Sequence, residues 1–333
     1  MMMKLLRKDL GDIFKIIDSY SKKHGLSYDV VEKDLWNCYF LDYLFNRSEY
    51  KDYFIFKGGT SLSKCYDLID RYSEDLDIVL DSNVLNINLE EKIDELVSRN
   101  QKEKFIDMIN KEAMNFIEDT LIPKMKSECE KEINKKLIFE LDRLKMAFYV
   151  SYPRLSMYGY ITPKIKIEMS SLSAIIPTEI KEAEPYINEE IEEDLKISFP
   201  VKCMKPKRTF WEKALILHQE ANRVSGDFPQ RYSRHYYDLY KIYNSSIWNE
   251  TINDIKLLDE VRKFTMTFYN RSWARFEEAK PKTFKLVPNN IYLLGIKRDY
   301  EAMSQMIFGV APSFNDIMEV IRKIEMEINN LWV

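Results

Sequence analysis

The sequence has little glycine, cysteine or histidine, and each scarcity excludes a class of protein. Of 333 residues, 8 are glycine, 4 are cysteine and 3 are histidine. The cysteines are far apart and form no CxxC pair, so we expect buried thiols in a reducing compartment rather than a disulfide framework or a zinc site. The histidines (His24, His218 and His235) are too scattered for a histidine-rich metal centre.

Long apolar runs and an excess of basic charge are absent as well. No segment approaches the roughly 18 apolar residues of a membrane span, and the N-terminus lacks an apolar stretch of signal-peptide length. We therefore expect a cytoplasmic protein without a membrane partner. Because the formal net charge is −4, an anionic partner would have to bind to a local basic patch. A composition of 45% hydrophobic and 31% charged residues is that of a protein able to bury a core.

Apolar periodicity predicts an N-terminal lobe that combines a sheet with helices. Helical spacing runs through residues 8–45 and again through residues 60–70. Short segments with strand-like patterns are expected to form the sheet: 53–57, 76–80, 145–152 and 161–169. A charged helical stretch at 88–136 is expected to be a solvated insertion.

The pattern becomes mainly helical after an acidic stretch at 179–194. No internal repeat or low-complexity linker interrupts the chain. We therefore expect an α+β fold with a mixed-sheet lobe over residues 1–200 and a mainly helical lobe over residues 201–333.

One stretch, KGGTSLSKCYDLIDRYSEDLDIVL at residues 57–80, breaks two rules of local stability. It places Gly58 and Gly59 side by side, although glycine loses more conformational freedom on folding than any other residue. It also places Asp75 and Asp77 on a predicted strand, where aspartate is depleted. Violations of this kind mark candidate functional sites.

The two aspartates occupy positions i and i+2 of a strand, so their side chains leave the same face of the sheet. Neighbouring carboxylates repel one another unless a cation lies between them, and Mg²⁺ or Mn²⁺ prefers oxygen ligands of this kind. Glu168, on the predicted strand KIKIEMS, is a candidate third metal ligand. Alternatively it accepts the proton of an attacking hydroxyl.

The glycine pair lies where a strand ends and a helix begins, so its backbone N–H groups can bind an anion. Thr60 and Ser61 add hydroxyl donors. A phosphate-binding turn beside metal-binding carboxylates suits phosphoryl or nucleotidyl transfer, because catalysis there is mainly positioning and charge neutralisation. The stretch lacks the glycine before lysine of a P-loop, so Lys64 is expected to be either a solvated helix lysine or a phosphate contact.

The order strand, Gly-Gly-Thr-Ser, helix, Ser-Glu-Asp-Leu-Asp, strand resembles the nucleotidyltransferase superfamily. More closely, it resembles the AbiEii/AbiGii-type nucleotidyltransferase toxins of type IV toxin–antitoxin and abortive-infection systems. Similar segments extend over most of the chain: 31–36, 56–62, 71–77, 152–153, 166–168, 210–214, 234–239 and 299–303.

This resemblance implies a nucleotidyltransferase-type mixed sheet with flanking helices and a C-terminal helical lobe that closes over the nucleotide. It implies transfer of NMP from an NTP to an acceptor hydroxyl, for which the 3′ end of a tRNA is the suggested acceptor, with blocked translation and growth arrest as the outcome. A neighbouring antitoxin protein is the implied partner. Lys213 would contact the triphosphate, Asp238 would belong to the active site, and Ser73 would join the nucleotide-binding residues.

Basic residues interleaved with aromatic residues suggest a local surface for an RNA backbone and a stacked base. The candidate contacts are Lys205, Lys207, Arg208, Arg231 and Arg234. A solvated face of a helical domain is the alternative. For Arg234 and Asp238, which have i, i+4 spacing, a surface ion pair is the alternative to a role in the site. The role of His235 stays open.

Other functions remain open for the same residues. The transferase would modify a protein, either itself or its antitoxin, if the acceptor hydroxyl belongs to a protein. A glycosyltransferase also uses a DxD motif for a metal-bound sugar nucleotide, but it would leave the Gly-Gly-Thr turn unexplained. A non-catalytic binding module on the same fold is a further alternative, against which the intact carboxylates argue.

Overall fold

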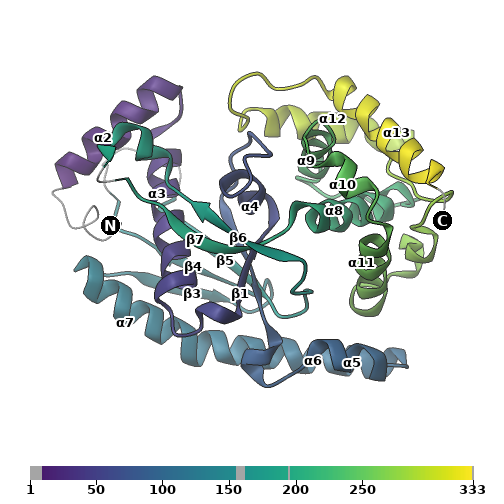
Figure 1. Ribbon diagram of the computed structural model, residues 1–333, viewed down its shortest axis with the longest axis horizontal. Coiled ribbons are helices and arrows are strands. Elements are labelled where there is room, and N and C mark those ends of the chain that lie inside the picture. Colours follow the sequence, from purple (N-terminus) through teal and green to yellow (C-terminus); the bar gives the residue numbers. More distant parts are fainter. Residues whose placement is uncertain (1–9, 155–161, 194–195, 332–333) are drawn as a thin grey trace. The chain divides into compact units, whose positions relative to one another are not determined.

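The computed structural model describes all residues except 1–9, 155–161, 194–195 and 332–333 (Figure 1). The chain forms two compact units. Unit 1 comprises the residues up to Cys65 together with Ser73–Cys203, and unit 2 comprises Tyr66–Tyr72 and the residues from Met204 onward. A boundary near residue 200 was expected from the sequence, but the assignment of residues 66–72 to unit 2 was not.

Unit 1 is built on a seven-stranded mixed sheet with the order β3-β4-β5-β2-β1-β7-β6. Its strands are β1 (Phe54–Lys57), β2 (Asp75–Leu80), β3 (Ile138–Asp142), β4 (Ala147–Ser151), β5 (Lys164–Ser170), β6 (Thr178–Ala183) and β7 (Phe199–Met204). β1 is antiparallel to β2 and parallel to β7, while β5 is parallel to β2 and antiparallel to β4. The mixed sheet expected from the sequence is confirmed. The short strands β3, β6 and β7 were not predicted.

The helices of unit 1 are α2 (Leu10–His24), α3 (Tyr28–Asp42), α4 (Gly58–Lys64), α5 (Leu89–Glu95), α6 (Arg99–Phe116) and α7 (Ile122–Ile133). The helix expected at 60–70 is wrong in extent, because α4 ends at Lys64. Beyond it, Asp67 takes a φ of 50°, a left-handed conformation that stops a helix and that aspartate tolerates better than most residues.

The stretch at 88–136 is not the solvated insertion that its charge suggested. Buried residues recur along α6, the π-helical turn Ile117–Leu121 and α7, and most follow a four-residue spacing: Ile109, Ala113, Ile117, Leu121, Met125, Cys129 and Ile133. A stripe of this spacing buries one face of a helix. The helices are therefore an integral part of the core of unit 1.

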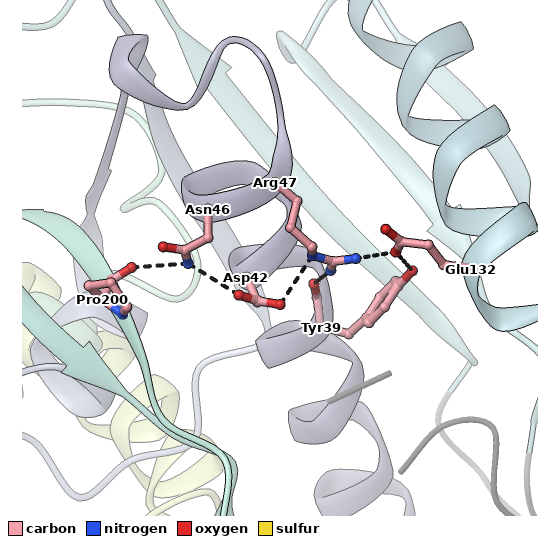
Figure 2. Close-up of polar contacts among 6 residues, drawn as sticks. All are labelled: Tyr39, Asp42, Asn46, Arg47, Glu132 and Pro200. Carbon is pink, nitrogen blue, oxygen red and sulfur yellow. Dashed lines mark hydrogen bonds and ion pairs between the residues drawn. The ribbon is translucent and has the colours of Figure 1, made fainter. Parts of the chain in front are cut away.

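Polar contacts join α3 and the turn that follows it to α7 on one side and to the sheet on the other (Figure 2). Arg47, in the π-helical turn after α3, pairs with Asp42 at 3.1 Å and with Glu132 of α7. Asn46 donates one hydrogen bond to Asp42 and another, of 3.2 Å, to the carbonyl of Pro200 in β7. Because Arg47 is largely buried, its two carboxylate partners are needed to offset the loss of hydration.

Unit 2 is mainly helical, as expected from the sequence. Its helices are α8 (Pro206–Ala221), α9 (Ser233–Tyr243), α10 (Trp248–Ile252), α11 (Ile255–Phe268), α12 (Asn290–Ser304) and α13 (Phe314–Asn330). The start of α9 is held by Asp299, whose carboxylate accepts the N–H groups of Arg231 and Ser233. None of the described helices in either unit is long and apolar enough to cross a membrane.

Candidate active site

The register of β1, β2 and β5 brings charged residues together on one face of the sheet of unit 1. Asp75 lies opposite Lys166, and Asp77 lies opposite Glu168. Cross-strand partners and residues two apart share a face, and neighbouring strands are about 4.8 Å apart. The predicted ligands Asp75, Asp77 and Glu168, hereafter the carboxylate cluster, therefore project from adjacent positions.

Lys166 belongs to the same face and was missed by the sequence reasoning. Its Nζ lies 3.7 Å from Oδ2 of Asp75 and forms a hydrogen-bonded ion pair with Glu168. Partial burial opposes the charge of the ammonium, but Glu168 and Asp75 outweigh it and raise the pKa of Lys166. Its position two residues before Glu168 on an alternating strand was the signal that could have identified it.

Within the described residues, no three His, Cys, Asp or Glu side chains are gathered as a ready-made metal site. The carboxylate cluster nevertheless fits a divalent cation in its ligand chemistry, since its oxygens lie on one face of two paired strands. The ammonium of Lys166 already contacts two of these carboxylates, so the oxygens do accept a positive charge.

Gly58 joins the glycine turn to the carboxylate cluster. Lys57 lies opposite Asp77, so the turn that follows β1 begins beside the Asp77 side chain. A Cβ on residue 58 would lie 2.1 Å from Oδ2 of Asp77, and Gly58 has a φ of 77°. Glycine is thus required twice, by backbone conformation and by the close approach of a carboxylate.

We expect Gly58→Ala to destabilise the protein by more than a positive φ alone explains. Gly25 is a matched control, because its φ is 65° and no atom lies within 4 Å of its hypothetical Cβ. Gly25→Ala should cost about 1 kcal/mol for backbone strain. Gly58→Ala should add roughly 1–3 kcal/mol for overpacking and should move Asp77. If urea unfolding shows the same loss of unfolding free energy in both variants, the Asp77 side chain moves aside without an energetic penalty.

The hydroxyls of α4 have different roles. Oγ1 of Thr60 donates to the carbonyl of Asp75 at 2.6 Å and so fixes α4 to the start of β2. Oγ of Ser61 is buried without a hydrogen-bond partner among the described residues. Because buried hydroxyls are nearly always hydrogen-bonded, Ser61 is the better candidate for a ligand contact. With only seven residues, α4 contributes little dipole, so any anion would be held by individual amides and hydroxyls.

Lys64 is neither solvated nor a free phosphate contact, so both expectations for it are wrong. Its side chain is 4% exposed and pairs with Asp34 of α3. It also donates to the carbonyl of Glu184 at 3.0 Å and lies 3.7 Å from the centre of the Tyr186 ring. Burial opposes its charge, but Asp34 outweighs burial and raises the pKa of Lys64. Lys64 thus ties α3 to α4.

In unit 2, Asp238 of α9 is the centre of a buried ion cluster. Arg71 donates to both of its oxygens, at 2.8 and 2.9 Å, and Nζ of Lys213 lies 2.9 Å from Oδ2. Asp238 is fully buried, so the surface pair considered for Arg234 and Asp238 is wrong. Although burial would raise it, the pKa of Asp238 is held below its usual range by Arg71 and Lys213. Arg71 was missed because nothing in the sequence pairs it with a residue 167 positions away.

His235 is also buried in unit 2. Burial, reinforced by the charge of Lys213, lowers the pKa of His235 well below its usual value, so its imidazole is neutral at pH 7. Its Nδ1 has no hydrogen-bond partner among the described residues.

The candidate RNA contacts differ in their surroundings. Lys207 lies 3.0 Å from both Glu250 and Asp254, and Arg208 is buried and pairs with Glu212. Lys205 is half-buried, as are Arg234 and the predicted nucleotide contact Ser73, whereas Arg231 is exposed. The positive charges of Lys207 and Arg208 are therefore balanced within unit 2, and an RNA interface stays a prediction.

One comparison with known proteins identifies a family, and another identifies a similar fold. A family model described as nucleotidyl transferase AbiEii toxin, type IV TA system, matches residues 39–320. Among solved structures the chain is similar to MenT4, a nucleotidyltransferase toxin from Mycobacterium tuberculosis H37Rv, with a TM-score of 0.50 and 15% sequence identity. That match covers 96% of this chain and 90% of the other, and at this identity it shows the fold alone. No curated protein matches the chain.

Proposed function

Because the chain belongs to the AbiEii family of nucleotidyltransferase toxins of type IV toxin–antitoxin systems, we propose that it transfers the NMP group of an NTP to an acceptor hydroxyl in a Mg²⁺-dependent reaction. The observation that carries this proposal is the carboxylate cluster beside the Gly58 turn. Family membership makes the chain a nucleotidyltransferase. The metal, the transferred group and the acceptor are the proposed parts.

In the proposed reaction the acceptor oxygen forms a bond to the α-phosphorus, the bond to the bridging oxygen breaks, and pyrophosphate leaves. Asp75 and Asp77 would hold the divalent cation, which when bound neutralises charge on the transferring phosphoryl group. Ser61 and the amides of the glycine turn would hold phosphate oxygens. Glu168, whose side chain is 38% exposed, would either share the cation or accept the acceptor's proton.

The remaining assignments rest on the family resemblance. Lys213 is proposed to contact the triphosphate, and Asp238 and Ser73 to belong to the site. The proposed acceptor is the 3′ end of a tRNA, whose modification would block translation and growth. An antitoxin protein is the partner that the family implies.

The proposal is tested with each NTP in turn, labelled at the α-phosphate, together with Mg²⁺ and total tRNA. We expect label on RNA with wild type, no label with the same NTP labelled at the γ-phosphate, and loss of labelling with EDTA. The γ-labelled NTP separates nucleotidyl transfer from phosphoryl transfer. Label on protein instead of RNA would replace the tRNA acceptor with a protein acceptor. No label from any NTP on either acceptor would contradict the proposed function.

A further inference from the structure

We propose that Lys166 is a resident counter-ion of the carboxylate cluster and makes divalent-cation binding depend on bound nucleotide. This inference rests on the proposed function, because it assumes that the cluster binds a metal. It assigns Lys166 a second position, on the nucleotide phosphates, that it takes when the metal enters.

The charges of the cluster support a resident counter-ion. Three carboxylates on one face repel one another unless positive charge lies beside them. Lys57 is opposite Asp77 and donates to Ser173 at 3.1 Å, whereas Lys166 pairs with two of the carboxylates. Lys166 is opposite Asp75 in the register and lies two residues from Glu168 on β5, so its side chain reaches both carboxylates. Without nucleotide, the ammonium therefore occupies oxygens that the metal needs.

A metal ion and the Lys166 ammonium cannot share these oxygens without strong repulsion between the two cations. Metal binding must break the ion pairs of Lys166 and leave an ammonium close to a divalent cation. The Lys166 side chain is 20% exposed and long enough to change rotamer. Lys166 can therefore leave the carboxylates by a rotamer change alone, provided that another anionic group lies within reach of its ammonium.

Nucleotide supplies that partner. Phosphates at the Gly58 turn would lie beside Asp77 of β2. Lys166 is on the neighbouring strand β5 and on the same face of the sheet as Asp77. Lys166 then exchanges carboxylate for phosphate oxygens as the metal takes the carboxylates. Metal and nucleotide consequently bind cooperatively, and by linkage each raises the affinity for the other by the same factor.

Lys164 provides a matched control on the same strand. Its side chain points to the same face and is 30% exposed, but it pairs with Glu140 at 2.6 Å rather than with the carboxylate cluster. If removing any lysine from this face changes Mn²⁺ affinity, Lys164→Met and Lys166→Met should show the same change. If the counter-ion of the carboxylate cluster is what matters, only Lys166→Met should change Mn²⁺ affinity.

The test measures Mn²⁺ binding from the electron paramagnetic resonance signal of free Mn²⁺, with and without a non-hydrolysable α,β-methylene NTP analogue. Samples without protein are subtracted, because the analogue itself chelates Mn²⁺. Wild type should bind Mn²⁺ weakly alone and more tightly with the analogue. Lys166→Met should bind Mn²⁺ alone roughly tenfold more tightly than wild type, because one nearby positive charge is removed. Its enhancement by the analogue should be smaller than that of wild type, because only the direct attraction between cation and phosphates remains. Lys164→Met and the charge-preserving Lys166→Arg should behave like wild type.

A Lys166→Met variant with wild-type affinity and wild-type enhancement would overturn the inference, as would weaker Mn²⁺ binding. In either case, the proposed function would still be supported if wild type binds Mn²⁺ and Asp75→Asn does not. Failure of wild type to bind Mn²⁺ with or without the analogue would contradict both.

Discussion

Asp75→Asn is expected to reduce nucleotidyl transfer by at least about a thousandfold, because it removes a charged metal ligand from a site that works by charge neutralisation. The change keeps the shape of the side chain. Asp75 is 30% exposed and lies 3.7 Å from Lys166, so the free energy of unfolding should change by less than about 1 kcal/mol. The initial rate of label transfer and urea unfolding together measure the two effects.

Asp142→Asn is the matched control for this prediction. Asp142 also lies on the sheet of unit 1, but it is on β3 and pairs with Lys145 at 3.4 Å. Its substitution should leave the rate of transfer within about twofold of wild type, since surface charges away from a site have small effects. A similar loss in both variants, or more than a tenth of wild-type activity in Asp75→Asn, would remove Asp75 from the proposed metal site.

Asp238→Asn is expected to cost about 3–5 kcal/mol of unfolding free energy, the largest stability effect that we predict. The wild-type carboxylate compensates two buried cations, Arg71 and Lys213. An amide in its place removes the negative charge that the two cations share, and both cations are buried. Urea unfolding of the variant and wild type at pH 7 measures the difference.

Lys213→Met separates loss of the counter-charge from loss of a contact. Asp238 keeps both hydrogen bonds from Arg71, and burial already lowers the pKa of Lys213 by penalising its charge. Replacing this ammonium by an apolar group should therefore cost about 1 kcal/mol or less. A loss in Lys213→Met as large as that in Asp238→Asn would contradict the assignment of Asp238 as the shared counter-charge.

The stabilisation that Asp238 gives to the folded protein should decrease in acid. The pKa of Asp238 is lower in the folded than in the unfolded protein, so its stabilisation is fully present above the unfolded value of about 4. It is lost as the pH falls through the lower folded pKa. The difference in unfolding free energy between wild type and Asp238→Asn should therefore be constant from pH 7 to about pH 5 and shrink in more acidic solution.

Local chemistry was enough to identify the carboxylate cluster and the glycine turn before the fold was known. The two-residue period of a strand places Asp75 and Asp77 on one face, and the paired glycines signal a close backbone approach. The structure adds that these features meet at one atom pair, because Gly58 leaves room for the Asp77 carboxylate. Composition misled at 88–136, where frequent charges concealed the four-residue spacing of a buried face.

Long-range partners were beyond the reach of the sequence. Periodicity gives the face of a strand or helix but does not identify the residue that meets it. Lys64 pairs with Asp34, 30 positions earlier, and Arg71 with Asp238, 167 positions later. Neither pair has a local signal, since burial of each charge depends on tertiary packing around it.

The most direct test of the account measures NMP incorporation and pyrophosphate release in the same reaction, with wild type and Asp75→Asn. For wild type we predict equal amounts of both products, each dependent on Mg²⁺. For Asp75→Asn we predict the loss of both. Incorporation without pyrophosphate, or transfer that persists in EDTA or in Asp75→Asn, would contradict a metal-dependent nucleotidyl transfer at the carboxylate cluster.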